Sequence, residues 1–390
     1  MGQPPRVPQR NPVLAVCLFV GLWAAWALPF VRVAPNRLLS GEPVYLNELL
    51  HGWTGITVVV ALASLVWAAL RPMQRATQSL VVAGMGLLLA LLWELAAAHA
   101  TVVAQTESAL YRTALGAGFW SLCAVSWLAC LDAVGRLQLA TLPRLAVVLL
   151  TTLPLLTLIV LGWGQELSIA KEYANRSDVF GAAVLRHLQI VVLSVLPAVM
   201  LGLPLAWAMA RHQRLRQAMF PVLNVIQTLP SIAVFGLLMA PLAWLATRYP
   251  VLAQAGISGV GLAPAVLALV LYSLLPITRS ALTGLEQVPV AVTTAARAMD
   301  MSAWQLFWQV ELPLALPVLW VGLRTAVVQT IGLAAVTALV GAGGLGSLMF
   351  DGLFSAANEL VMLGVLPMVL MAVLADAAFK ALAALMERPS

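Results

Sequence analysis

Long apolar runs alternate with short polar segments along almost the whole chain. A helix needs about 20 mostly apolar residues, within a range of roughly 17 to 25, to cross a bilayer. Ten runs of about this length predict membrane-spanning helices at residues 13–31, 54–70, 79–98, 114–132, 145–163, 187–210, 221–246, 260–278, 317–340 and 360–379. The pattern therefore predicts an all-α integral membrane protein with about ten transmembrane helices.

A polar segment at residues 166–186 divides these runs into two halves. Five predicted spans lie in residues 1–165 and five in residues 187–390. Asn, Gln, Thr, Ser, Pro and Gly occur inside the spans mainly in the second half. Polar groups are costly in hydrocarbon and usually face a bundle interior or a watery cavity. We therefore expect the functional residues in the second half.

The composition supports the same class of protein. Hydrophobic residues make up 62% of the chain and charged residues only 9%, whereas a soluble domain has about 45–50% apolar and about 25% charged residues. The formal net charge is +6, but the basic residues are spread over the connecting segments. We therefore expect contact with membrane lipid and no nucleic-acid partner.

The positions of the basic residues indicate the orientation of the chain. With the N-terminus in the cytoplasm, 13 of the 21 Lys and Arg residues fall in cytoplasmic segments, seven fall in external segments, and Arg324 lies inside a span. Cytoplasmic loops carry an excess of basic residues. The count predicts a multi-pass protein of the cell inner membrane with both termini in the cytoplasm, and it makes residues 166–186 an external loop.

The stretch TTAARAMDMSAWQLFWQVELPLALP, residues 293–317, is too polar for a span. Three alanines favour a helix at its start, and a methionine with three aromatic residues follows. Pro313 is expected to end the helical part, because the residue before a proline is pushed out of helical space. The stretch is either a hairpin that docks into a partner or an amphipathic helix that lies on the bilayer.

The same residues resemble the coupling loop of ABC importer permeases. That pattern is Glu-Ala-Ala, three residues, Gly, nine residues and Ile-x-Leu-Pro. Thr294 and Asp300 replace the usual Glu and Gly, and Asp is among the few other residues that tolerate a left-handed turn. The resemblance implies that the cytoplasmic loop 279–313 forms a short helix that fits a cleft on an ATPase subunit. The residues expected to couple to the ATPase are Thr294, Ala295, Ala296, Arg297, Asp300, Met301, Leu312 and Pro313.

Four further segments extend the resemblance over about residues 185–380. They are QTLPSIAVFGLL (227–238), GVGLAPAVLALVLYSLLPITRSALTGL (259–285), ELPLALPVLWVGLRTAVVQTIGLA (311–334) and LVGAGGLGSLMFDGL (339–353). Together they resemble the permease subunit of osmoprotectant importers, which handle glycine betaine and related quaternary ammonium compounds, in a branch with extra N-terminal spans.

This resemblance implies a five-helix type I ABC importer permease core in residues 187–390. It also implies a cytoplasmic ABC ATPase dimer, a periplasmic or extracellular solute-binding protein and a second permease chain as partners. ATP and Mg would bind to the ATPase, and this chain would hold no cofactor and perform no chemistry. The chain has no G-x-x-x-x-G-K-[ST] motif of its own.

The predicted span 221–246 carries a candidate translocation pathway. If the span is one helix, Asn224, Gln227, Thr228 and Ser231 share one face, because they are spaced i, i+3, i+4 and i+7. Pro230 would bend this helix locally. Two interpretations stay open: the polar side chains line a pathway, or they form hydrogen bonds between helices.

The segment GAGGLG, residues 341–346, formally matches a dinucleotide-binding pattern. It follows a predicted span instead of a strand, so the context for nucleotide binding is missing. Irregular backbone at membrane depth is tolerated where protein or water covers it. We therefore expect a re-entrant or gate segment that depends on Gly341, Gly343, Gly344 and Gly346.

The remaining polar residues offer few other functions. Arg324 either pairs with Glu94 or Asp376 or extends toward the membrane surface. Cys17, Cys123 and Cys130 lie in apolar spans and are expected to pack as small hydrophobic residues, and no metal site is expected. Two alternatives to osmoprotectant import are a permease for another small solute, such as an amino acid, and a non-transporting membrane sensor or scaffold.

Overall fold

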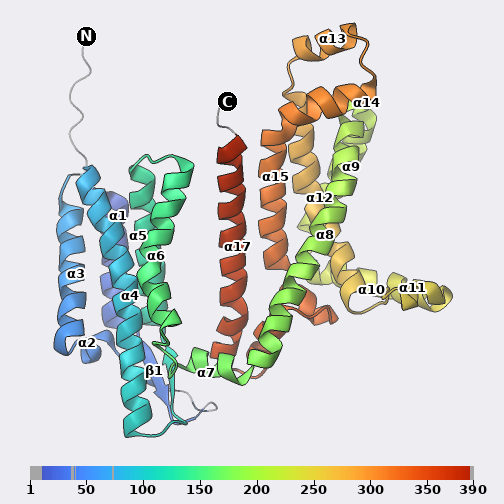
Figure 1. Ribbon diagram of the computed structural model, residues 1–390. Helices are drawn as coiled ribbons and strands as arrows, with labels where there is room; N and C mark the ends of the chain where they lie inside the picture. The colour runs from blue at the N-terminus through green and yellow to red at the C-terminus, as the bar shows by residue number, and fades with distance from the viewer. Residues whose placement is uncertain (1–10, 37–38, 40, 73, 387–390) are drawn as a thin grey trace, which may run out of the picture. The chain divides into compact units, whose positions relative to one another are not determined.

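The computed structural model describes residues 11–36, 39, 41–72 and 74–386. The chain is predominantly helical (Figure 1), which confirms the predicted α-helical class. It divides into two compact units, Met1–Asn175 and Arg176–Ser390, which we call the N-terminal and the C-terminal unit. The boundary lies inside residues 166–186.

The N-terminal unit contains seven helices and three short strands among its described residues. In chain order they are α1 (Pro12–Ala27), β1 (Val31–Ala34), β2 (Glu42–Val44), α2 (Leu46–Leu49), α3 (Gly52–Leu70), α4 (Arg75–Thr106), β3 (Arg112–Leu115), α5 (Ala117–Arg136), α6 (Thr141–Val160) and α7 (Ser168–Asn175). Asn11 caps α1 by accepting a hydrogen bond from the Leu14 N–H, and Pro12 occupies the first helical position, where its missing N–H costs nothing.

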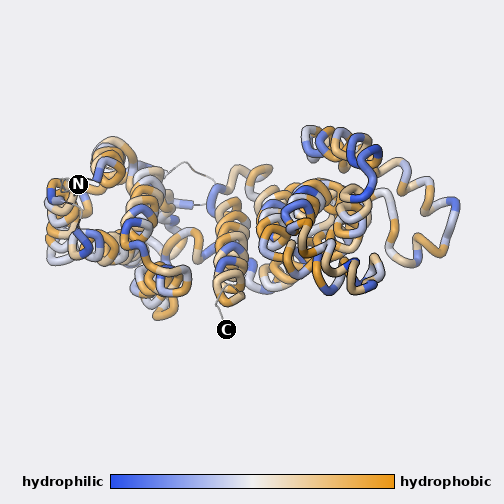
Figure 2. Tube along the Cα trace, turned by 90° about the horizontal axis from the view of Figure 1, so that it is seen from above, coloured by the Kyte–Doolittle hydropathy of each residue, from blue (hydrophilic) through white to orange (hydrophobic). Residues whose placement is uncertain are grey.

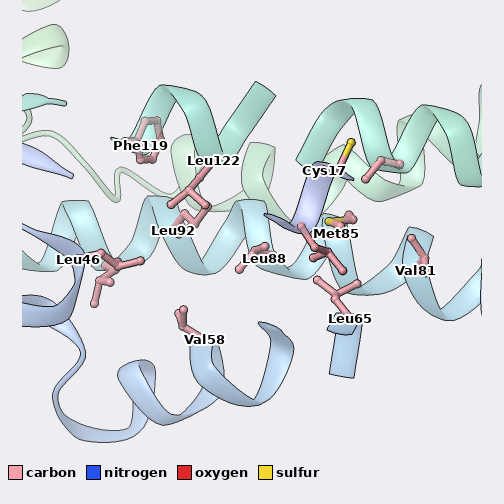
Figure 3. Close-up of a cluster of buried hydrophobic side chains, with 14 of the residues drawn as sticks. Cys17, Leu46, Val58, Leu65, Val81, Met85, Leu88, Leu92, Phe119 and Leu122 are labelled. Carbon is pink, nitrogen blue, oxygen red and sulfur yellow. The ribbon is translucent and has the colours of Figure 1, made fainter. Parts of the chain in front are cut away.

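One hydrophobic cluster holds this unit together (Figure 3). Leu65 of α3, Met85 and Leu92 of α4 and Phe119 of α5 all point into it, and each is almost fully buried. Burial of such a side chain stabilises a fold by about 1.5–3 kcal/mol when the unburied side chain would be in water. Between helices in a membrane, van der Waals packing drives the association instead. The cluster involves only residues of the N-terminal unit.

A three-stranded antiparallel sheet in this unit was not predicted from the sequence. The strand order is β2-β1-β3, and Val31 is paired with Val44 on one side and with Leu115 on the other. The first predicted span, 13–31, therefore gives a helix that ends at Ala27, and its last residue begins β1. At 16 residues, α1 is shorter than the other apolar helices of this unit that the hydropathy pattern predicted.

Residues 166–186, expected to be an external loop, are mostly helical. They contain α7 and the first ten residues of α8, which begins at Ser177. The Lys171 ammonium lies 2.8 Å from a Glu166 carboxylate oxygen and donates hydrogen bonds to the Ala109 and Tyr111 carbonyls. These bonds fix α7 within the N-terminal unit.

The C-terminal unit is built from long helices with shorter ones between them. They are α8 (Ser177–Arg211), α9 (Gln213–Thr228), α10 (Ser231–Arg248), α11 (Pro250–Gln254), α12 (Leu262–Glu286), α13 (Val290–Ala298), α14 (Ala303–Leu306), a π-helix (Phe307–Glu311), α15 (Leu312–Leu333), a 3-10 helix (Val336–Val340), α16 (Leu345–Phe354) and α17 (Asn358–Met386). The predicted span 317–340 therefore ends as an α-helix at Leu333.

Within the part of the chain that the structure describes, nine helices are long and apolar enough to cross a membrane. Five belong to the C-terminal unit: α8, α10, α12, the continuous helix Ala303–Leu333 and α17. Most residues along these helices are hydrophobic (Figure 2), and many large apolar side chains are exposed, as expected for surfaces that face lipid or a second membrane subunit.

Candidate functional site

Residues 290–313, which contain the proposed coupling motif, form a hairpin of helices at one end of the C-terminal unit (Figure 1). The first helix, α13, ends in a Schellman motif: the Met301 N–H bonds to the Ala296 carbonyl, and the Asp300 N–H bonds to the Arg297 carbonyl. This motif requires a left-handed residue after the helix. Asp300 occupies that position with φ of 59°, so the turn keeps its geometry without glycine.

The second helix begins with a reciprocal cap. The Ser302 hydroxyl accepts a hydrogen bond from the Gln305 N–H, and the Gln305 side chain accepts one from the Ser302 N–H, as in a capping box. The sequence therefore specifies both the end of α13 and the start of α14, with only the short turn between them.

The expectation that Pro313 ends the helical part is wrong. The chain stays helical from Ala303 to Leu333, and the π-helix at 307–311 directly precedes Leu312 and Pro313. A proline ring clashes with the carbonyl four residues earlier, here that of Gln309. The wider π turn, in which the Leu312 N–H bonds to the Phe307 carbonyl, relieves that clash and lets the helix continue.

We expect Asp300→Gly to leave the free energy of unfolding within about 1 kcal/mol of the original value, because glycine removes the left-handed strain but adds freedom to the unfolded chain. ATP hydrolysis coupled to transport should be unchanged or slightly higher. Asp300→Ala is the matched control, since it keeps a Cβ in the strained position and should lower stability. Normal stability with a large loss of coupled hydrolysis in Asp300→Gly would show that the carboxylate has a function of its own.

The residues of the motif differ in their exposure. Thr294, Ala295, Arg297, Asp300 and Pro313 are exposed, and Met301 and Leu312 are half-buried. Ala296 is only 6% exposed, so it packs inside the hairpin instead of on its outer surface. The outer surface also includes Met299, Trp304 and Trp308, which are exposed to 78%, 64% and 47%.

Aromatic rings and one ion pair join this hairpin to the end of α8. The Phe307 ring lies 5.8 Å from the Trp207 ring in an edge-to-face arrangement. The Arg211 guanidinium stacks over Trp207 at 4.3 Å and lies 3.0 Å from a Glu311 carboxylate oxygen. Sequence reasoning missed Trp207 and Arg211 because they lie about 100 residues from their partners, a separation that carries no signal.

The predicted span 221–246 is two helices. After α9 ends at Thr228, the backbone leaves the helical conformation at Leu229 and Pro230, and α10 begins at Ser231. The expectation that Asn224, Gln227, Thr228 and Ser231 share one helix face is therefore wrong for Ser231. The helix can end at this point because the Leu229 carbonyl, which has left the helical hydrogen-bond pattern, finds another donor. The Tyr272 hydroxyl donates to it at 2.6 Å.

A small polar cluster surrounds this break. The Gln227 amide donates to the Tyr272 carbonyl and accepts a hydrogen bond from the Gln329 amide at 3.3 Å. Gln227 therefore forms hydrogen bonds between helices, as one of the two interpretations of these side chains predicts. Asn224 and Thr228 are exposed, as expected for side chains that line a pathway. Gln329, on α15, is a polar residue of this cluster that the sequence interpretation did not single out.

The glycine segment, residues 341–346, links the 3-10 helix to α16. Gly341, Gly343 and Gly344 have φ of 80°, 85° and 83°, a left-handed region that glycine enters without steric cost. Gly346 differs, because it lies in α16 and a Cβ there would be 2.0 Å from the Ala335 carbonyl oxygen. The four glycines therefore serve two purposes: three form turns, and one permits close packing.

Two side chains in the first third of α8 bond to this segment and to the end of α15 before it. The Arg186 guanidinium donates to the Ala342 carbonyl at 2.9 Å, and the His187 ring, which is completely buried, lies 3.0 Å from the Ile331 carbonyl. That carbonyl is at the C-terminal end of α15, where helix carbonyls lack intrahelical partners. Neither residue was predicted from the sequence.

The charges of α15 and α17 form a structural group. The Arg324 guanidinium lies 3.6 Å from an Asp376 carboxylate oxygen, so the predicted pairing with Asp376 is present. Asp376 also accepts the Lys380 ammonium at 2.6 Å. Among the described residues there is no group of His, Cys, Asp and Glu that could hold a metal ion.

Two family models match the chain. Residues 9–170 match the N-terminal domain of the ABC transporter permease YehY, and residues 198–388 match the inner membrane component of binding-protein-dependent transport systems. The chain is 39% identical over 191 residues to the osmoprotectant import permease protein OsmW of Salmonella typhimurium, over 49% of this chain and 84% of that relative. The chain belongs to the ABC importer permease family.

A second relative is also named as a permease. This chain is 40% identical to the glycine betaine/carnitine/choline transport system permease protein OpuCD of Bacillus subtilis, over 49% of this chain and 77% of that relative. Among solved structures, one of the MetNI methionine ABC transporter in an inward-facing conformation has a TM-score of 0.47 at 21% identity, over 55% of this chain and 99% of that chain. The family agrees with the resemblance found in the sequence.

Proposed function

We propose that this permease subunit of a binding-protein-dependent importer carries glycine betaine or a related quaternary ammonium osmoprotectant. The support comes from relatives named as permeases for osmoprotectants, glycine betaine, carnitine and choline. The C-terminal unit supplies the five long helices of a permease core. The substrate class rests on these relatives.

The hairpin at residues 290–313 is proposed to dock into a cytoplasmic ABC ATPase dimer that binds ATP and Mg. Its exposed tip, with Ala295, Arg297 and Met299 on the outside, supports this role: small residues permit close approach, and the flexible Met299 side chain adapts to a partner surface. The hairpin geometry favours a docking element over a single helix that lies on the bilayer. The Schellman motif that ends α13 and the capping box that begins α14 define a short turn, so the two helices form one projecting unit.

This docking role, together with the distribution of the basic residues along the sequence, supports the proposed orientation. The hairpin and both chain termini lie on the cytoplasmic side of the inner membrane, and residues 341–346 lie toward the outside, where a solute-binding protein delivers the ligand. A second permease chain completes the pathway. The break at Leu229 and Pro230, with Gln227 and Thr228 beside it, is proposed to line that pathway, and the glycine segment to gate it.

Reconstitution tests this proposal. The permease, its cognate ATPase and its binding protein are combined in liposomes, and ATP-dependent uptake of labelled glycine betaine is measured. Uptake is expected and should disappear when residues 294–300 are scrambled, because the scrambled hairpin cannot present the Schellman turn to the ATPase. ATPase association, measured separately, shows whether coupling or assembly has failed.

The other outcomes distinguish the alternatives. Stable ATPase association without glycine betaine uptake would contradict the substrate assignment and point to another small solute, which uptake measurements with labelled amino acids then test. Neither uptake nor ATPase association would contradict the importer role of this chain and favour a sensor or scaffold.

A further inference from the structure

One helix contacts both segments that the proposed function uses. Helix α8 is 35 residues long, and Arg186 near its start and Arg211 at its end contact the two segments. At about 1.5 Å per residue, these side chains are attached about 38 Å apart along the helix, somewhat more than the roughly 30 Å hydrocarbon core of a bilayer. A single element therefore connects the 290–313 hairpin with the glycine segment.

At the hairpin end, the contact fixes both position and direction. The Arg211 guanidinium nitrogen Nη2 donates to both carboxylate oxygens of Glu311, at 3.3 Å and 3.0 Å. The Glu311 side chain is only 12% exposed and that of Arg211 27% exposed, so solvent screens this pair less than a fully exposed one. Trp207 lies against both Arg211 and Phe307, which restricts the movement of Arg211.

At the glycine end, α8 holds two backbone carbonyls. Arg186 bonds to Ala342 within the glycine segment, and His187 bonds to Ile331 at the end of α15. A Cβ on Gly344 would lie 3.3 Å from His187 atoms, so the glycine backbone packs directly against α8. A shift of this end of the helix must therefore move the glycine segment or break these bonds.

Between its ends, α8 packs closely on α12. The buried face of α8 includes Ser194, Ala198, Gly202 and Ala206, all small residues. A Cβ on Gly202 would lie 2.9 Å from an Ile277 side-chain carbon of α12. Small residues allow helix backbones in membranes to approach closely. Helix α8 therefore packs on α12 between two ends that are each held by side-chain bonds.

We propose that α8 transmits movement of the 290–313 hairpin to the glycine segment, with Arg211 as the positioning residue at one end and Arg186 with His187 at the other. The inference rests on the proposed docking of the hairpin to an ATPase, and it adds the route by which that docking reaches the external side. Arg211 is a positioning residue, because its contacts are with Glu311 and Trp207.

The test measures the accessibility of a residue next to the glycine segment while the other end of α8 is changed by substitution. Ser347 of α16, which is half-buried, is replaced by cysteine (Ser347→Cys) in the reconstituted permease–ATPase complex. The rate at which a water-soluble reagent modifies the introduced thiol is measured with and without ATP and vanadate, with the unsubstituted permease as the background.

Four variants are compared in this assay. Arg211→Glu and Glu311→Arg each break the ion pair, and the double charge exchange restores it with the charges reversed. Arg214→Glu is the matched control, because it makes the same charge change three residues away, at an exposed position with no ion pair among the described residues.

We expect ATP to change the modification rate in the Ser347→Cys permease and in the same permease with Arg214→Glu added. The change should be lost in Arg211→Glu and in Glu311→Arg and restored in the double exchange, while ATPase association stays the same throughout. If Arg211→Glu is not recovered as folded protein, the nearly isosteric Glu311→Gln gives the same test.

Two results would contradict the inference, and they can be told apart. An unchanged ATP response in a folded Arg211→Glu or Glu311→Gln variant with normal ATPase association overturns the inference alone. Failure of the original permease to bind the ATPase overturns both the inference and the proposed function.

Discussion

Ala296→Arg is expected to abolish both ATPase association and solute uptake. Ala296 is 6% exposed, and its carbonyl accepts hydrogen bonds from the Met299 and Met301 N–H groups that form the turn. A guanidinium side chain cannot fit at this buried position. Overpacking of this kind costs about 1–3 kcal/mol, which is enough to unfold a short hairpin whose own stability is small. The measurements are co-purification with the ATPase and uptake into liposomes.

Ala295→Arg is the matched control, because Ala295 is exposed on the same helix. This substitution should leave the turn intact and weaken association with the ATPase only by changing the docking surface. The two variants can be separated by limited proteolysis: the Ala296→Arg hairpin should be cleaved readily and the Ala295→Arg hairpin should not. Normal uptake by Ala296→Arg would contradict the assignment of this turn to ATPase docking.

Gly346→Ala is expected to eliminate uptake and to lower thermal stability strongly. The added Cβ would lie 2.0 Å from the Ala335 carbonyl oxygen and 2.8 Å from its carbonyl carbon. Both are backbone atoms, so a side-chain rearrangement cannot relieve the clash and α16 must move as a whole. We expect a cost of about 3 kcal/mol, at the upper end of the usual range for overpacking. Thermal unfolding in detergent and uptake in liposomes measure the two effects.

Gly332→Ala is the matched control for this substitution. It lies in α15, and a Cβ there would meet nothing within 4 Å. Alanine is favoured over glycine inside a helix by about 1 kcal/mol, so this variant should be as stable as the original or more stable. Equal uptake by Gly346→Ala and Gly332→Ala would mean that α16 separates easily from the end of α15, contrary to the packing described above.

The hydrophobic pattern predicted most of the membrane helices because each span is a local signal. Helices α3 to α6, α8, α12 and α17 each overlap one predicted run. The sheet was missed because its strands have only three or four residues, too few to show alternation, and because β1 pairs with β3 about 80 residues away. Local pattern carries no information about such pairing.

The prolines show the limit of local reasoning most clearly. Pro230 was expected to bend a helix and instead separates two, because Tyr272 provides a donor for the freed Leu229 carbonyl. Pro313 was expected to end a helix and instead lies inside one, because the π-helix before it makes room for the ring. Each outcome depends on a hydrogen-bond arrangement that a proline alone does not specify.

The candidate site was predicted in part. The motif located the hairpin, and the tolerance of Asp for left-handed backbone agrees with the observed φ at Asp300. Ala296, expected at the docking surface, is buried within the hairpin. The bonds made by Arg211, Arg186 and His187 could not be predicted, since they join residues about 100 to 156 positions apart.

The division of the chain after Asn175 has a consequence for synthesis. The large hydrophobic cluster of the N-terminal unit draws only on residues before this point, and the remaining clusters draw only on residues after it. Ribosomes add about 5–20 residues per second, so the first unit has on the order of 10–40 s to complete its packing before the last residue is added. We therefore expect a substitution that disrupts this first packing step to expose the nascent chain to membrane proteases before the 290–313 hairpin has been made.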